Sequence, residues 1–201
     1  MDVPAEALLG IALGIGLAAA TGLRAFLPLL LAGMAARADL LPITEAFAWL
    51  ATTPALVTLG VAAVFETLAY YVPGLDHALD VLAGPAAMVA GVVASASVMT
   101  DVPPYVLWPV AIIAGGGVAG LTKGGAALVR AKAGLATAGI ANPVVSTAET
   151  VGALGMTALA IAVPLLSLLA IIVFLAWAVR KAGRILFGRR PRAEPDTESD
   201  A

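Results

Sequence analysis

The sequence predicts an all-α membrane protein, a polytopic bundle of six transmembrane helices. Of its 201 residues, 61% are hydrophobic and only 12% are charged, whereas soluble domains are about one quarter charged. The apolar residues form long stretches, and about 20 of them in a row suffice to cross the hydrocarbon layer as a helix. This length leaves room for one membrane domain and no separate soluble enzyme. The absence of cysteine excludes disulfide and thiol chemistry.

Six apolar stretches are expected to cross the membrane. In order, they run from Glu6 to Ala35, Pro54 to Val72, Leu75 to Met99, Pro104 to Ala131, Val144 to Val163 and Leu165 to Phe187. Gly84 and Pro85 are expected to break the third helix, because proline lacks a backbone N–H. The fifth and sixth stretches are nearly continuous and too long for one span, so Pro164 is predicted to turn the chain back.

Basic residues predict the orientation. They follow the fourth and the last span, as Arg130, Lys132, Arg180, Lys181, Arg184, Arg189, Arg190 and Arg192. Such residues are concentrated on the cytoplasmic side of membrane proteins. Six spans then place both termini in the cytoplasm, and we expect a multi-pass protein of the cell membrane. We expect residues 1–187 to form a single transmembrane domain and residues 188–201 to form a disordered cytoplasmic tail.

The domain divides into two halves of three spans, residues 6–99 and 104–187. Small residues recur at every fourth position near the start of both halves, as Gly10, Gly14, Ala18 and Gly22, and as Gly116, Gly120 and Gly124. Such stripes allow helix backbones to approach closely. Each half also carries a cation and then an anion, Arg24 and Glu66 first, Lys123 and Glu149 second. Because three is an odd number of crossings, a second copy would be an inverted repeat.

Four charges inside spans are the main candidate site. An ionisable group there costs about 2.5–3.5 kcal/mol unless it is paired or hydrated. One interpretation is that Arg24–Glu66 and Lys123–Glu149 are ion pairs that fix helix register. The other is that these groups bind a substrate or carry a proton. Both interpretations stay open at the level of sequence.

Two local motifs add further candidates. Asn142 is predicted to cap the fifth helix, and Ser146 and Glu149 follow on the same face. Amide groups at such a helix start attract anions. Asp76 is predicted to cap the third helix, with Asp80 one turn later. With His77 between them, the two carboxylates are candidates for binding a divalent ion or relaying a proton. Ordinary capping is the favoured interpretation, so we assign no metal site.

Several of these residues together resemble a family of small bacterial and plastid membrane proteins named as a domain of unknown function, number 4126. The resemblance rests on Thr21-Gly22-Leu23-Arg24 with Pro28, Glu66 with Pro73-Gly74-Leu75-Asp76 and Asp80, Gly84-Pro85, Gly116-Gly117, and Asn142-Pro143 with Ser146 and Glu149. It extends from about Leu8 to Val179. Tyr70 and Tyr71 stand where the family has an acidic-basic pair. The resemblance implies a multi-pass membrane protein and no established activity.

Two functions remain open. One is a small transporter or lipid-moving protein that binds an anionic or zwitterionic solute, and the other is a membrane scaffold whose ion pairs are structural. The chain has no GxSxG, HExxH or phosphate-loop motif, so we expect neither an enzyme nor a cofactor. Its formal net charge of -2 does not favour nucleic acid. Expected partners are the lipid bilayer, anionic lipid at the basic C-terminal segment and a second copy in a homo-oligomer.

Overall fold

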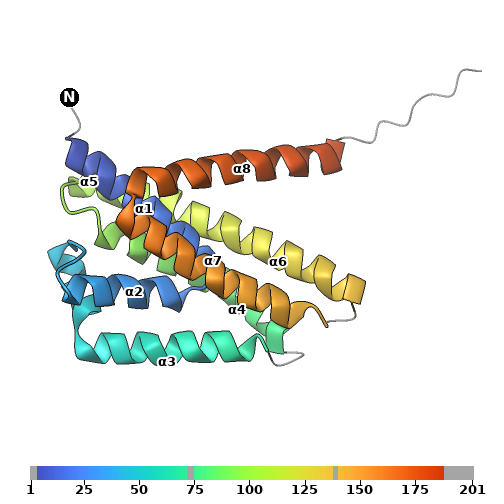
Figure 1. Cartoon of the computed structure of the whole chain (residues 1–201). Coiled ribbons are helices and arrows are strands. Elements are labelled where there is room, and N and C mark those ends of the chain that lie inside the picture. Colours follow the sequence, from blue (N-terminus) through green and yellow to red (C-terminus); the bar gives the residue numbers. More distant parts are fainter. Residues whose placement is uncertain (1–3, 72–74, 138–139, 188–201) are drawn as a thin grey trace, which may run out of the picture.

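The structure is a computed structural model that describes residues 4–71, 75–137 and 140–187, and the regular structure in these ranges is helical throughout. The elements are α1 (Ala5–Leu23), α2 (Phe26–Arg37), η1 (Glu45–Ala51), α3 (Thr53–Ala69), α4 (Leu75–Ser97), α5 (Pro104–Val110), η2 (Ala111–Gly116), α6 (Gly117–Thr137), α7 (Asn142–Ala162) and α8 (Pro164–Phe187) (Figure 1). The predicted all-α fold is confirmed. The predicted tail, residues 188–201, lies outside the described residues.

The first predicted span is two helices instead of one. Arg24 leaves the helical conformation, with φ −139° and ψ 117°, and α2 begins two residues later. Pro28 explains this break, because a proline cannot donate to the carbonyl four residues earlier and its ring clashes with that carbonyl. The residue four positions before Pro28 is Arg24. The expectation of one continuous helix from Glu6 to Ala35 was therefore wrong.

The two helices form a hairpin. Figure 1 shows α2 running back toward the end of the molecule at which α1 begins. Side-chain packing agrees, because Ala7 at the start of α1 and Phe47 in η1 belong to the same apolar cluster, together with Met99 and Leu107. The α1–α2 segment thus returns to its own side, and Arg24 lies at its tip.

Helix α1 is the centre of the bundle and packs against α4, α6, α7 and α8. Its small residues make this possible. A Cβ added at Gly14 would lie 2.9 Å from the Ser95 carbonyl of α4, and one at Gly22 would lie 2.5 Å from the Ala119 carbonyl of α6. The first small-residue stripe is therefore a packing surface. In the second stripe, Gly124 has nothing within 4 Å of such a Cβ.

The later predicted breaks have opposite outcomes. Helix α4 continues through Gly84 and Pro85, so the predicted break is wrong. Membrane helices tolerate proline when neighbouring groups satisfy the freed backbone. The turn at Pro164 is confirmed, since α7 ends at Ala162 and α8 begins at Pro164. Between α5 and α6, η2 is a π-helical turn, for which the sequence offers no signal that we can identify.

The described helices support fewer than six spans by length and composition. Three are long and apolar enough: Ala5–Leu23, Pro104–Thr137 and Asn142–Ala162. A fourth is η1 with α3, if this pair, bent by 65°, counts as one span. Shorter apolar helices are Phe26–Arg37, Leu82–Ser97 and Pro164–Trp177. The chain therefore has the helices of a membrane protein, but six clear spans are not seen.

The predicted inverted repeat is also not seen. The two stripes match α1 to α5–α6, yet these segments run in the same direction, because Ala7 packs near Leu107 and Gly22 packs on Ala119. The next helices that would correspond in the two halves, α3 and α7, also pack differently. Helix α3 packs mainly on α2, whereas α7 packs on α1, α2, α6 and α8. Similar stripes reflect a similar need for close packing, which does not require a repeat.

Candidate functional site

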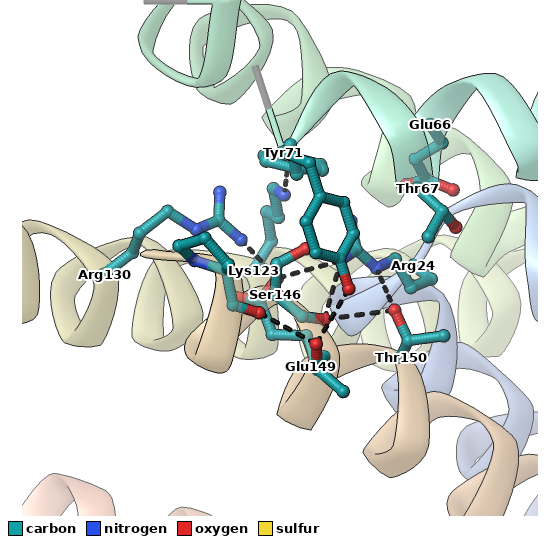
Figure 2. Close-up of polar contacts among 12 residues, drawn as sticks. Arg24, Glu66, Thr67, Tyr71, Lys123, Arg130, Ser146, Glu149 and Thr150 are labelled. Carbon is teal, nitrogen blue, oxygen red and sulfur yellow. Dashed lines mark hydrogen bonds and ion pairs between the residues drawn. The ribbon is translucent and has the colours of Figure 1, made fainter. Parts of the chain in front are cut away.

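Arg24, at the break between α1 and α2, is the centre of the site. Its side chain is fully buried and binds α7 through two nitrogens. Nε donates to Thr150 Oγ1 at 3.0 Å. Nη2 donates to the Ser146 carbonyl at 2.8 Å and to Ser146 Oγ at 2.6 Å. Because the helix ends at Arg24, its side chain projects from the tip of the hairpin and crosses directly to α7 (Figure 2).

Glu149 lies between two guanidinium groups. Its Oε2 is 3.8 Å from Arg24 Nη2 and accepts a hydrogen bond from Arg130 Nη2 of α6. All three side chains are at most 5% exposed. Charge-assisted hydrogen bonds of this kind are about twice as strong as neutral ones. Glu149 therefore joins the α1–α2 tip to α6 and α7.

Glu66 of α3 caps the second helix of the hairpin. Its Oε1 accepts the Ala25 N–H at 2.8 Å, and its Oε2 accepts the Phe26 N–H at 3.2 Å. The first amides of a helix have no partner within the helix, and a carboxylate there is favoured by the helix dipole. The predicted Arg24–Glu66 ion pair was therefore wrong: Glu66 binds the backbone just after Arg24, and Arg24 turns to Glu149.

Tyr70 brings three cations together. Its buried ring lies 4.6 Å from Arg24 Cζ, 4.9 Å from Lys123 Nζ and 4.1 Å from Arg130 Cζ, measured to the ring centroid. Its hydroxyl accepts a hydrogen bond from Lys123 Nζ at 2.7 Å. A ring face attracts cations within about 6 Å. Tyr70 is thus a shared contact for side chains from the hairpin tip and α6.

The second predicted ion pair was also wrong. Lys123 is buried and donates to Tyr70, whereas Glu149 binds Arg24 and Arg130. The described ion pairs of Glu149 therefore include one across the two predicted halves. A helix-forming stretch places Lys123 and Arg130 two turns apart on the same face, so α6 presents both cations to the cluster.

The remaining predicted residues have mixed outcomes. Ser146 contacts Arg24 directly, and Asn142 is the first residue of α7, one turn before Ser146. Asn142 was expected to precede the helix as its cap, and the cap position belongs to Ala141 instead. Asp76 and Asp80 lie in the first turns of α4, but their side chains are outside the described part of the structure.

Comparison with known proteins identifies the family. Residues 11–184 match the family described as Domain of unknown function (DUF4126). The chain belongs to this family. The resemblance that the sequence motifs predicted is thereby confirmed. No curated protein and no solved structure matches the chain significantly, and the family description carries no activity, so the function of this DUF4126 member has to be argued from its site.

Three residues of this DUF4126 site were not predicted. Arg130 was assigned to the cytoplasmic rim, but it is buried because α6 continues to Thr137, beyond the expected end of the span. Tyr70 was noted only as a departure from the family pattern. Thr150 had no assignment. Spacing carried the signal in each case, since Arg130 follows Lys123 by seven residues, Tyr70 follows Glu66 by four and Thr150 follows Ser146 by four.

The residues around Arg24 form a site that can bind a charged ligand. A guanidinium held by α7, a carboxylate between two guanidiniums and a capped helix start meet at one place, all inside an apolar bundle. Fixed dipoles and charges in a low dielectric interact strongly with an ionic ligand.

Proposed function

We propose that this protein is a small membrane translocator that moves an anionic or zwitterionic solute or lipid headgroup. The observation that carries the proposal is the helix break at Arg24, which places a fully buried guanidinium at the tip of a hairpin inside the bundle. Irregular backbone at membrane depth is tolerated where it is buried in protein or lines a water-filled path. Transporters use interrupted helices in this way to form substrate sites.

The capped start of α2 supports the same function. In transporters the positive end of a half-helix faces an anionic group of the substrate. Here the group is the Glu66 carboxylate, held by the Ala25 and Phe26 amides. Neutralising Glu66 would weaken its hydrogen bonds to these amides, and in the proposed mechanism this is how a proton or an incoming anion alters the position of Arg24.

The hairpin changes the proposed topology. The sequence led us to expect both termini in the cytoplasm of a cell-membrane protein with six spans. A hairpin that returns to its own side removes one crossing, so in the proposed topology the start of α1 and the end of α8 fall on opposite sides of the membrane. Figure 1 shows these two ends at opposite ends of the bundle, which agrees with this topology. We place the end of α8 in the cytoplasm, because Lys132 and Arg180 lie on that side. The basic end of α8 would contact anionic lipid there.

A scaffold is the second candidate, and the direct charge pairing favours it. Glu149 binds both Arg24 and Arg130, and all three side chains are nearly or fully buried. Buried ionic networks can serve register and specificity alone. Such a protein would hold its helices, and copies of itself or a partner, without moving a solute.

Flux through liposomes separates the two functions. We expect the wild-type protein to release an entrapped anionic solute or to move a labelled anionic lipid between leaflets. Glu66→Gln and Glu149→Gln should each reduce the rate by about 5- to 150-fold, since each removes an interaction worth about 1–3 kcal/mol. Glu45→Gln is the matched control, because Glu45 is an exposed carboxylate of η1. Background flux by the wild-type protein for every solute and lipid tried would reject the translocator and leave the scaffold.

A further inference from the structure

Two unpartnered atoms stand out in the charged cluster. Within the part of the chain that the structure describes, Arg24 Nη1 and Glu149 Oε1 are buried and have no hydrogen-bond partner. One is a donor and the other an acceptor. The other terminal nitrogen of Arg24, Nη2, and the other carboxylate oxygen of Glu149, Oε2, are only 3.8 Å apart. Buried charged groups are normally hydrogen-bonded, and leaving one unsatisfied is unfavourable.

The other two nitrogens of the Arg24 guanidinium already donate hydrogen bonds. Nε donates to Thr150, and Nη2 donates to two oxygens of Ser146. These bonds fix the side chain on α7 and leave Nη1 to face a further acceptor. Glu149 is fixed in the same manner, because its Oε2 is held by Arg130. Both unpartnered atoms are therefore preorganised, which reduces the entropy that a ligand loses on binding.

The unpartnered atoms Arg24 Nη1 and Glu149 Oε1 determine which chemical groups a ligand must carry. An acceptor is needed for Nη1 and a donor for Oε1. A protonated oxyanion supplies both from one group, through an anionic oxygen and an O–H. An ammonium group would donate to Oε1, but it would enter a cluster where three cationic heads already lie within 4.9 Å of the centroid of the Tyr70 ring.

We propose that Arg24 Nη1 and Glu149 Oε1 bind a protonated phosphate group, with Nη1 donating to a phosphate oxygen and Oε1 accepting from P–OH. This inference rests on the proposed function and names its substrate class. The group can come from inorganic phosphate or from the headgroup of a phosphate-monoester lipid.

A carboxylate in such a site acts as a selectivity element. At neutral pH inorganic phosphate keeps at least one proton, whereas sulfate keeps none. Sulfate would set an anionic oxygen against Glu149 Oε1 with no proton between them. A site that hydrogen-bonds one ligand rejects an analogue without that group far more strongly than its size alone would allow, and repulsion against the wrong ligand adds to the discrimination.

Titration calorimetry on the full chain in detergent tests this selectivity. We expect phosphate to bind and sulfate to bind at least about tenfold more weakly. Glu149→Gln should reduce this ratio to about threefold or less, because an amide can donate to sulfate. Arg24→Lys should weaken phosphate at least about tenfold, since lysine lacks the guanidinium fork. Arg37→Lys is the matched control, because Arg37 is exposed and binds Thr53, and it should change neither affinity.

The source of the phosphate is tested in nanodiscs. A phosphate monoester has a second pKa of about 6, so at about pH 6.5 a fraction of the monoester molecules carry P–OH. We expect phosphatidic acid to raise the unfolding temperature of the wild-type protein more than that of Arg24→Lys if a lipid is the source, and phosphatidylcholine, a diester without P–OH, to have no such effect. Binding of inorganic phosphate with no effect of phosphatidic acid assigns the site to the free ion.

Some results would overturn the inference. These are equal binding of phosphate and sulfate by the wild-type protein, no binding of phosphate in either form, or phosphate binding that Arg24→Lys leaves unchanged. The first two need no variant, so they stand even if a variant does not fold. Transport of another solute without phosphate binding would reject only this inference. Phosphate binding without any flux would reject only the translocator.

Discussion

At the scale of single residues, the break at Arg24 determines how the charges are used. If the chain had continued as a helix through Arg24, the Ala25 and Phe26 amides would have bonded within it and Glu66 would have been available to Arg24. Pro28 prevents that. The freed amides therefore donate hydrogen bonds to Glu66, and the Arg24 guanidinium donates to Ser146 and Thr150 and pairs with Glu149. One backbone feature therefore reassigns two carboxylates.

Glu66 should stabilise the protein mainly as a cap. Glu66→Ala leaves two amides without their acceptor inside the bundle, and we expect it to lower the free energy of unfolding by about 2–4 kcal/mol. Glu66→Gln keeps one carbonyl oxygen and should lose about half as much. Unfolding in detergent measures both, with Glu45→Gln as the exposed control. A Glu66→Ala protein as stable as the wild type would contradict the capping role.

Much of the site was predictable from residue type, and its pairing was not. Arg24, Glu66, Lys123, Ser146 and Glu149 stood out as polar groups in apolar stretches, and the structure gathers them at one place. Their partners depend on which helices touch, and spacing along the chain does not contain that information. Sequence order favoured pairs within each half, whereas packing of α1 on α7 brought Arg24 to Glu149.

At the scale of helices, small residues and prolines predict different things. The stripe of α1 was correctly predicted to be a packing surface, because absence of a side chain has the same effect in any close contact. The prolines were less certain guides. Pro28 and Pro164 end helices, whereas Pro85 lies inside α4. Neighbouring helices decide whether a proline interrupts a membrane helix, so local sequence cannot settle it.

The stripe of α1 should therefore be intolerant of a single methyl group. At Gly22 a Cβ would lie 2.5 Å from both the Ala119 carbonyl and Thr122 Cβ, and we expect Gly22→Ala to destabilise the protein by about 1–3 kcal/mol. Gly124→Ala is the matched control in α6, where a Cβ meets nothing within 4 Å.

Helix propensity alone should make Gly124→Ala neutral or up to about 1 kcal/mol more stable than the wild type. Unfolding in detergent and the amount of protein recovered from membranes measure both variants. Equal stability of the two would mean that α1 and α6 are not in close contact near Gly22.

At the scale of the whole molecule, the α1–α2 hairpin changes the side of the membrane that we predict for each later segment. Counting apolar stretches treated residues 6–35 as one crossing. The structure folds them back at Arg24, so α1 and η1 share one end of the bundle and the remaining helices alternate from there (Figure 1). Hydropathy measures the length of an apolar stretch and does not detect a reversal within it.

Labelling of introduced cysteines can decide this topology, because the natural chain has no cysteine. We expect Glu6→Cys and Glu45→Cys to react with a membrane-impermeant maleimide applied to intact cells, and Lys132→Cys and Arg180→Cys to react only after permeabilisation. All four positions are exposed in the structure, so burial within the protein does not account for a failure to react, and reaction after permeabilisation confirms that the position is accessible. If residues 6–35 crossed once, Glu6 and Glu45 would lie on opposite sides and only Glu45→Cys would be labelled from outside. The Glu6 result therefore distinguishes the hairpin from the single span, and the Lys132 and Arg180 results test the orientation independently.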